Sequence, residues 1–221
     1  LASGQFLASC ASLLAFVVLS RILTKSDYAT YRQTMLAYHF AAPLLILGLP
    51  QALYYFLPGE KERPRAILYE NLIVLSFLAV VFSLFLSCGG NRLLAWRFSN
   101  PDIEYSLLLL APYPLFMLPV ASFSSCLMAR GVVKPVAVFS VVSKLITLLL
   151  VLAASVLWRP PQAAIAATVA GAGILLFPTV KLMLDATNEG ARRPAFSGML
   201  RQLKFSVPIG IASAIGVITY A

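Results

Sequence analysis

Long apolar runs separated by short polar stretches dominate the chain. Six of these runs are complete and about 20 residues or slightly longer, a length at which an α-helix crosses the ~30 Å hydrocarbon core of a bilayer. A helix satisfies its own backbone hydrogen bonds, so such a run in lipid is expected to be helical. The predicted spans are residues 1–23, 34–57, 67–88, 105–128, 135–157 and 162–184, and a seventh is predicted to begin near Phe205.

The composition excludes an ordinary soluble domain. The chain is 60% hydrophobic and 11% charged, whereas soluble domains are about 45–50% apolar and about 25% charged. The predicted fold class is therefore all-α, a polytopic transmembrane helix bundle of six spans plus the start of a seventh. We expect a six-helix bundle over residues 1–185, a basic cytoplasmic linker over 186–204 and the truncated start of a second bundle over 205–221. Both ends fall inside apolar runs, so we interpret the chain as a fragment.

Basic residues set the expected orientation. The chain has 17 Lys and Arg against 8 Asp and Glu, a formal net charge of +9. Ten basic residues lie in or at the edges of the loops after the second, fourth and sixth runs, and six lie in or at the edges of the other loops. Because cytoplasmic loops carry the excess of Lys and Arg, we expect the even loops and the N-terminus in the cytoplasm. This pattern fits anionic lipid head groups, and we exclude nucleic acid as a partner because no basic and aromatic stripe is present.

One basic residue, Lys144, lies inside an apolar run instead of a loop. It is nine residues after Pro135, or ~14 Å along a helix, and so near the middle of the bilayer. Ser140, Thr147 and Ser155 fall on the same helical face. A charge at this depth costs ~2.5–3.5 kcal/mol on insertion scales, which favours a cation that faces a water-filled cavity or an anionic substrate. The alternative is a lysine buried between helices that pairs with a carbonyl or carboxylate for packing.

Other polar residues and prolines inside the runs are further candidates. Gln5 shares a face of the first run with several serines, which ordinary small-residue packing also explains. His39, early in the second run, could carry protons or belong to an interfacial aromatic belt. Pro112, Pro114 and Pro119 interrupt backbone hydrogen bonding in the fourth run, so we predict either a bend that moves or a static kink.

No motif for catalysis or metal binding is present in the sequence. The three cysteines, Cys10, Cys88 and Cys126, form no CxxC or His/Cys cluster, so neither a metal site nor a disulfide framework is expected. Glu70 and Asp185 stand near the ends of runs, and no GxSxG or Walker A motif is present. We therefore predict no catalytic residue, no metal, no cofactor and no enzyme activity, with H⁺ or Na⁺ as an unidentified coupling ion.

The stretch SRILTKSDYATYRQTMLAYHFAAPLLILGLPQALYYFLP resembles the first loop and second helix of polysaccharide flippases, within the multidrug/oligosaccharidyl-lipid/polysaccharide exporter superfamily. One departure is Ala29 or Thr30, where many relatives have Gly. The matching features are Ser20, Arg21 and Leu23 ending the first run, Tyr28 and Tyr31 in the turn, Leu47 to Pro50, the aromatic stretch Tyr54 to Pro58, and Met128 to Gly131 in a later loop.

The resemblance implies two six-helix bundles that face each other across a central cavity, with this chain as the first bundle. It also implies movement of glycans linked to polyprenyl pyrophosphate, such as lipopolysaccharide O-antigen units, across the bacterial inner membrane by alternating access. Lys144 would then meet the pyrophosphate, because a fixed cation is strong where screening is poor. Arg21 and Arg32, near the periplasmic side, would engage the head group or anchor the helices. Expected partners are membrane lipids, the lipid-linked glycan and other membrane proteins of glycan assembly.

Two alternatives stay open. A cation-coupled drug exporter of the same fold often uses an acidic residue in helix one, and the first run has none. An integral membrane enzyme of glycan assembly would favour a large loop with paired Arg or His and a carboxylate, which the sequence lacks. The glycan flippase is therefore the preferred interpretation.

Overall fold

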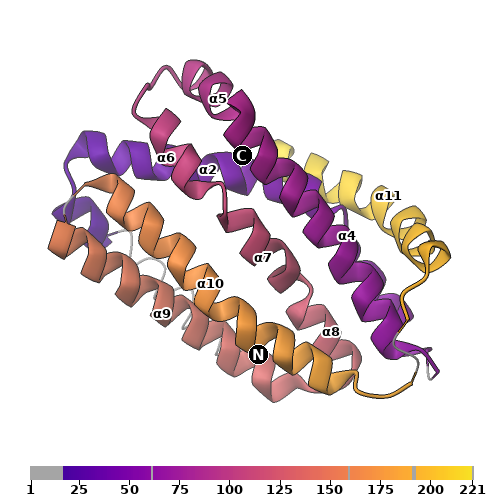
Figure 1. The fold of residues 1–221 in the computed structure, drawn as a ribbon. Helices are drawn as coiled ribbons and strands as arrows, with labels where there is room; N and C mark the ends of the chain where they lie inside the picture. The colour runs from indigo at the N-terminus through magenta and orange to yellow at the C-terminus, as the bar shows by residue number, and fades with distance from the viewer. Residues whose placement is uncertain (1–16, 61, 159, 191–192, 221) are drawn as a thin grey trace. The chain divides into compact units, whose positions relative to one another are not determined.

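The computed structural model describes residues 17–60, 62–158, 160–190 and 193–220 (Figure 1). Within these ranges the fold is helical with no strand, which confirms the all-α class. A short helical segment over residues 17–22 comes first. The helices that follow are α2 (Lys25–Ile46), α3 (Leu49–Phe56), α4 (Pro64–Phe85), a π-helical turn (Leu86–Gly90), α5 (Asn91–Arg97), α6 (Ile103–Leu110), α7 (Tyr113–Ala121), α8 (Phe123–Ala129), α9 (Val133–Trp158), α10 (Pro161–Ala186) and α11 (Phe196–Tyr220).

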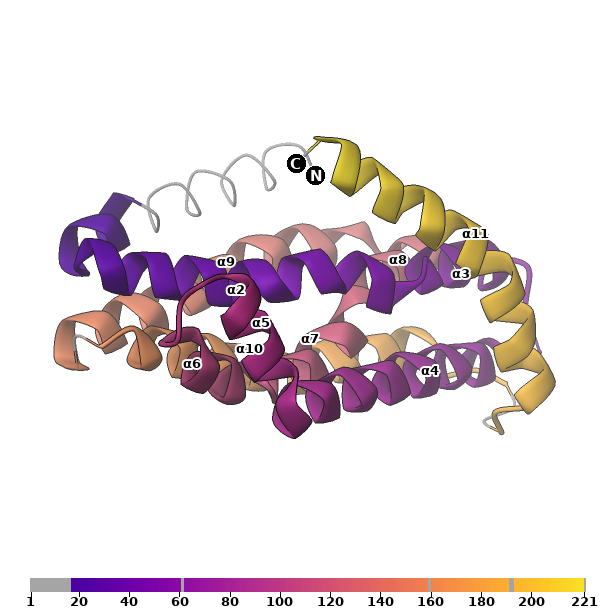
Figure 2. The same cartoon turned by 90° about the horizontal axis from the view of Figure 1, so that it is seen from above.

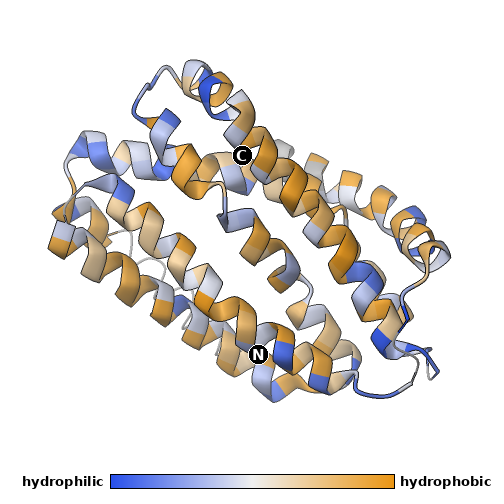
Figure 3. Ribbon diagram, in the orientation of Figure 1, coloured by the Kyte–Doolittle hydropathy of each residue, from blue (hydrophilic) through white to orange (hydrophobic). Residues whose placement is uncertain are grey.

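Four helical stretches among the described residues are long and apolar enough to cross a membrane. They are Lys25–Phe56, Pro64–Arg97, Val133–Trp158 and Pro161–Ala186, and a fifth is present if the bent pair Asp102–Leu110 and Tyr113–Ala129 is one span. Hydrophobic residues follow the lengths of these helices, and hydrophilic ones gather near their ends (Figure 3). The chain is therefore a multi-pass membrane protein. Six spans plus a seventh stay a prediction, because most of the first run lies outside the described residues.

The helices break where the sequence supplies glycine or proline. The second predicted run is divided between α2 and α3 at Leu47 and Gly48, which have φ values of 49° and 69°. The fourth run bends by 52° around Pro112, between α6 and α7. Motion at this bend stays a prediction. α11 begins at Phe196, before the predicted start near Phe205, because residues 197–204, a mixed polar and apolar stretch, form its first turns.

The described chain divides into two compact units. The first comprises Leu1–Tyr38, Val81–Phe116 and Ala137–Leu175, of which the described part begins at residue 17. Its apolar core includes Leu19, Leu23, Val151 and Ala164, with Tyr28 and Tyr31 packed against them. Polar contacts join its connecting segments: the side-chain amide of Asn100 donates to Gln33 Oε1 at 2.8 Å, and Arg92 pairs with Glu104 at 2.9 Å.

The second unit comprises His39–Val80, Met117–Val136 and Leu176–Ala221. In this unit α3 packs against both α8 and α11, and Figure 2 shows α11 alongside α3. The backbones of α11 and the α2–α3 break come into direct contact. A Cβ placed on Gly48 would lie 2.6 Å from the Ser206 carbonyl oxygen and 3.0 Å from the Gly210 nitrogen. Gly48 therefore permits both the left-handed backbone conformation at this break and the close approach of α11.

Gly48→Ala is expected to lower the melting temperature more than Gly131→Ala. Both glycines have left-handed φ values, 69° and 74°, so both substitutions incur a backbone cost of about 1–2 kcal/mol. A Cβ at Gly131 meets nothing within 4 Å, whereas one at Gly48 meets the α11 backbone. Thermal unfolding of each purified variant in detergent, followed by tryptophan fluorescence, measures the difference. Equal melting temperatures would contradict the close contact with α11.

Candidate functional site

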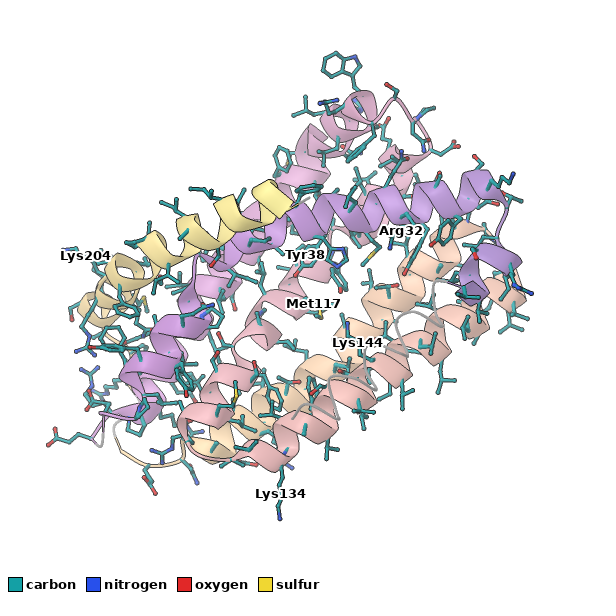
Figure 4. All side chains as sticks on the ribbon, turned by 180° about the vertical axis from the view of Figure 1, so that it is seen from behind. Arg32, Tyr38, Met117, Lys134, Lys144 and Lys204 are labelled. Carbon is teal, nitrogen blue, oxygen red and sulfur yellow. The ribbon has the colours of Figure 1, made fainter. Side chains whose placement is uncertain are left out.

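Lys144 lies in the middle of α9, inside a membrane-length helix of the first unit. Its side chain is exposed, and it has no ion-pair partner among the described residues. Figure 4 shows it leaving α9 toward the side on which Tyr38 of α2, also in the first unit, lies. The lysine is therefore not buried in a helix contact within the described part of the chain, and its charge is available to a ligand.

The neighbouring hydroxyl groups on α9 are engaged in their own helix. Thr147 donates to the Ser143 carbonyl at 2.9 Å, and Ser140 donates to the Ala137 carbonyl at 3.3 Å. Thr147 also lies where α9 meets α10, because a Cβ on Gly171 would be 3.5 Å from its Oγ1. Gly171 thus permits α9 and α10 to approach closely. On the predicted polar stripe, Lys144 is exposed, and the nearby hydroxyl residues Ser140 and Thr147 are half-buried.

The other predicted cavity residues are distributed along the chain. Arg21 ends the helical segment 17–22 and is exposed. Arg32, in the first unit, and His39, in the second, are both exposed residues of α2. Gln5 lies outside the described residues. No hydrogen bond or ion pair joins Arg21, Arg32 or His39 to Lys144 within the described ranges, so a cluster around the lysine stays a prediction.

A buried polar network that the sequence analysis missed joins α3, α4, α11 and the start of α8 in the second unit. Its centre is Asn71, which is fully buried. The Asn71 amide donates to the Leu49 carbonyl and to Gln202 Oε1, both at 2.9 Å. Its oxygen accepts a hydrogen bond of 2.7 Å from the hydroxyl of Ser122. One amide side chain therefore joins these elements in the conformation that the structure shows.

Glu70, one residue earlier on α4, extends this network toward the α10–α11 connection. The residue is 2% exposed. Its carboxylate accepts hydrogen bonds from the Ala195 backbone N–H at 3.0 Å, from Gln202 Nε2 at 3.2 Å and from Arg63 at 3.4 Å. A buried carboxylate is tolerated only when it is paired and hydrogen-bonded, and Glu70 meets both conditions.

Three arginines, from the α3–α4 connection, the first turn of α4 and the α8–α9 connection, hold the segment between α10 and α11. The sequence analysis assigned these basic residues only to membrane orientation. An acidic residue just inside a span, seven positions after Arg63, was the one local signal of the network. The contacts are Arg130 with the Ala186 carbonyl at 3.0 Å and Glu189 at 3.1 Å, Arg65 with Asn188 at 2.6 Å, and Arg63 with the Arg193 carbonyl at 3.3 Å.

Asn71→Ala is expected to destabilise the protein strongly, and Asn188→Ala is the matched control. Removing the Asn71 amide leaves buried partners on Ser122 and Gln202 unsatisfied, at about 1–3 kcal/mol for each. Asn188 is exposed, and among the described residues its side chain contacts Arg65, so its loss is expected to cost about 1 kcal/mol or less. Melting temperatures in detergent test the difference. Similar losses in both variants would show that the network does not stabilise the unit.

Comparison with known proteins identifies the family of the chain. A family model described as polysaccharide biosynthesis protein matches residues 1–220. A search of curated proteins finds no match. The family match extends through both units and includes the stretch of the first loop and second helix that resembles polysaccharide flippases. The chain therefore belongs to the polysaccharide biosynthesis protein family.

Proposed function

We propose that the chain is part of a transporter that flips lipid-linked oligosaccharide or polysaccharide repeat units across the bacterial inner membrane by alternating access. The family is involved in polysaccharide export or assembly, and the described helices are of membrane length. The observation that carries the proposal is Lys144, an exposed charge in the middle of an apolar helix. Such a charge in a membrane span is a functional group by default, since lipid offers it no partner.

The substrate fits the chemistry of that lysine. Polyprenyl pyrophosphate carries its negative charge next to the lipid, at the point where the glycan must cross the apolar core. An ammonium group that has given up its bulk hydration forms strong, charge-assisted hydrogen bonds to phosphate oxygens. Lys144 would stabilise the pyrophosphate during the crossing. Arg21 and Arg32, both exposed, would contact the head group before or after it.

The proposed orientation places the N-terminus and the even loops in the cytoplasm. Two observations support it. Residues after the second, fourth and sixth runs meet in the second unit, through the contacts of Arg65 with Asn188 and of Arg130 with Glu189. Residues after the first and third runs meet in the first unit, where Asn100 contacts Gln33. Spans that alternate in direction bring alternate loops together in this way, and the even loops carry more basic residues.

The remaining elements of the proposal follow from the transport function. The chain would catalyse no covalent reaction and need no cofactor. A gradient of H⁺ or Na⁺ would supply the driving force. Its partners would be membrane lipids, the lipid-linked glycan and neighbouring membrane proteins of glycan assembly, and a second six-helix bundle would complete the cavity.

Lys144→Ala is expected to reduce glycan export about tenfold or more, because one hydrogen bond to a charged group contributes about 1.5–3 kcal/mol. Lys144→Arg keeps the charge and should retain part of the export. Lys134→Ala removes an exposed lysine from the same helix and should export normally. Complementation of a deletion strain, with surface glycan quantified at matched protein levels, measures all three.

The state of the retained glycan distinguishes transport from enzyme activity. In the Lys144→Ala strain, complete repeat units should accumulate on the lipid carrier in the cytoplasmic leaflet. Accumulation of incomplete units would instead indicate an enzyme of glycan assembly. Full export by both Lys144 variants would disprove the role of the lysine.

A further inference from the structure

We propose that Glu70 is a latch that holds the start of α11 against α4 in one conformation of the transport cycle and releases it in another. The inference rests on the proposed function, because only a protein with two conformations needs a contact that opens. It concerns the second unit alone and does not involve Lys144.

The first argument is that one carboxylate holds the start of α11 at several points. Ala195, directly before α11, donates its backbone N–H to Glu70, and Gln202 donates from inside the helix. Arg63 contacts both the Glu70 carboxylate, at 3.4 Å, and the Arg193 carbonyl, at 3.3 Å. Loss of the Glu70 charge would therefore weaken the contacts of the connecting segment and of the helix together.

The second argument is the closeness of the approach. Gly198 lies in the first turn of α11, and a Cβ at this position would collide with the Glu70 carboxylate. Glycine inside a helix costs about 1 kcal/mol relative to alanine. The contact with Glu70 gives a reason for glycine here, since any other side chain would displace the Glu70 carboxylate or the start of α11 from this contact.

The third argument is that the contact can open at low cost. A pocket of about 240 Å³ adjoins the carboxylate, and water there occupies about 30 Å³ per molecule, so several waters fit. Arg63, on its rim, is 43% exposed, so its guanidinium stays hydrated when the ion pair parts. Water in the pocket can replace the hydrogen bond between Arg63 and the Glu70 carboxylate as the start of α11 moves, unlike the apolar contacts of a packed core. The pocket is lined by Glu60, Arg63, Ile67, Glu70, Ser197, Gly198 and Arg201.

Spin-label distances across this pocket test the latch. The full-length protein, with its native cysteines replaced by serine, would carry labels at Glu60→Cys and Ser197→Cys, which line the pocket outside the hydrogen-bonded network. Double electron–electron resonance in lipid nanodiscs would measure the distance distribution. We expect a dominant short distance and a minor long one. Glu70→Gln should shift their ratio toward the long distance by about tenfold, the effect of losing one charged hydrogen bond.

The matched control is Glu189→Gln, which removes the partner of Arg130 from an exposed ion pair in the same connection. It should leave the distances unchanged. Gly198→Ala should shift the distances in the same way as Glu70→Gln. It replaces Glu70→Gln in the test if that variant does not accumulate in the membrane. If Glu70→Gln and Gly198→Ala lower the melting temperature but leave the distances unchanged, Glu70 only stabilises one fixed structure and the latch is disproved.

The outcomes separate this inference from the proposed function. Normal glycan export by the deletion strain would disprove the transport function, whatever the distances show. Loss of export in that strain, together with unchanged distances in Glu70→Gln and Gly198→Ala, would disprove the latch alone. A shift in the distances together with reduced export by Glu70→Gln supports both.

Discussion

The need to satisfy buried polar groups governs the second unit. Asn71 and Glu70 stand next to each other on α4 and have almost no exposed surface. Away from the pocket beside Glu70, water cannot replace a missing partner in a membrane interior, so each buried donor and acceptor there must find one within the protein. The helices that supply those partners, α3, α11 and the start of α8, are thereby fixed around α4. Close packing at Gly48 and Gly210 then brings the α11 backbone against the α2–α3 break.

Sequence patterns predicted several of the helices well because the lipid requires each spanning run to be apolar and about 20 residues long, whatever the other runs do. The predicted runs over 135–157 and 162–184 correspond to α9 and α10 within a few residues. The break at Leu47 and Gly48 could not be read from hydropathy, since both residues stand in a continuous apolar run. Gly48 permits the break, and the contact with α11 that accompanies it joins distant parts of the chain. The early start of α11 has a similar origin, because Gln202 is polar yet buried by its contacts with Asn71 and Glu70.

The candidate site was predictable only in part. Lys144 was selected because a charge in an apolar run is conspicuous in any sequence; the structure shows it exposed on α9, and its role in binding stays a prediction. Thr147 shares its face of the helix by periodicity, but it lies at the α9–α10 contact, which periodicity does not reveal. The contacts of the loop arginines could not be predicted from the sequence. The number of these arginines indicated the membrane orientation, whereas their contacts with Ala186 and Arg193 depend on pairings between distant parts of the chain.

The long sequence separations in the Asn71–Glu70 network have a consequence for biosynthesis. Ala195 and Gln202 lie 125 and 131 residues after their partners. At a synthesis rate of about 5–20 residues per second, α4 leaves the ribosome roughly 6–26 s before these partners exist. During that interval a carboxylate and an amide approach the membrane unsatisfied, apart from contacts within the emerging chain such as Arg63. The insertion machinery must therefore accommodate α4 in a polar environment until α11 arrives, and membrane integration of this span is coupled in time to a helix made much later.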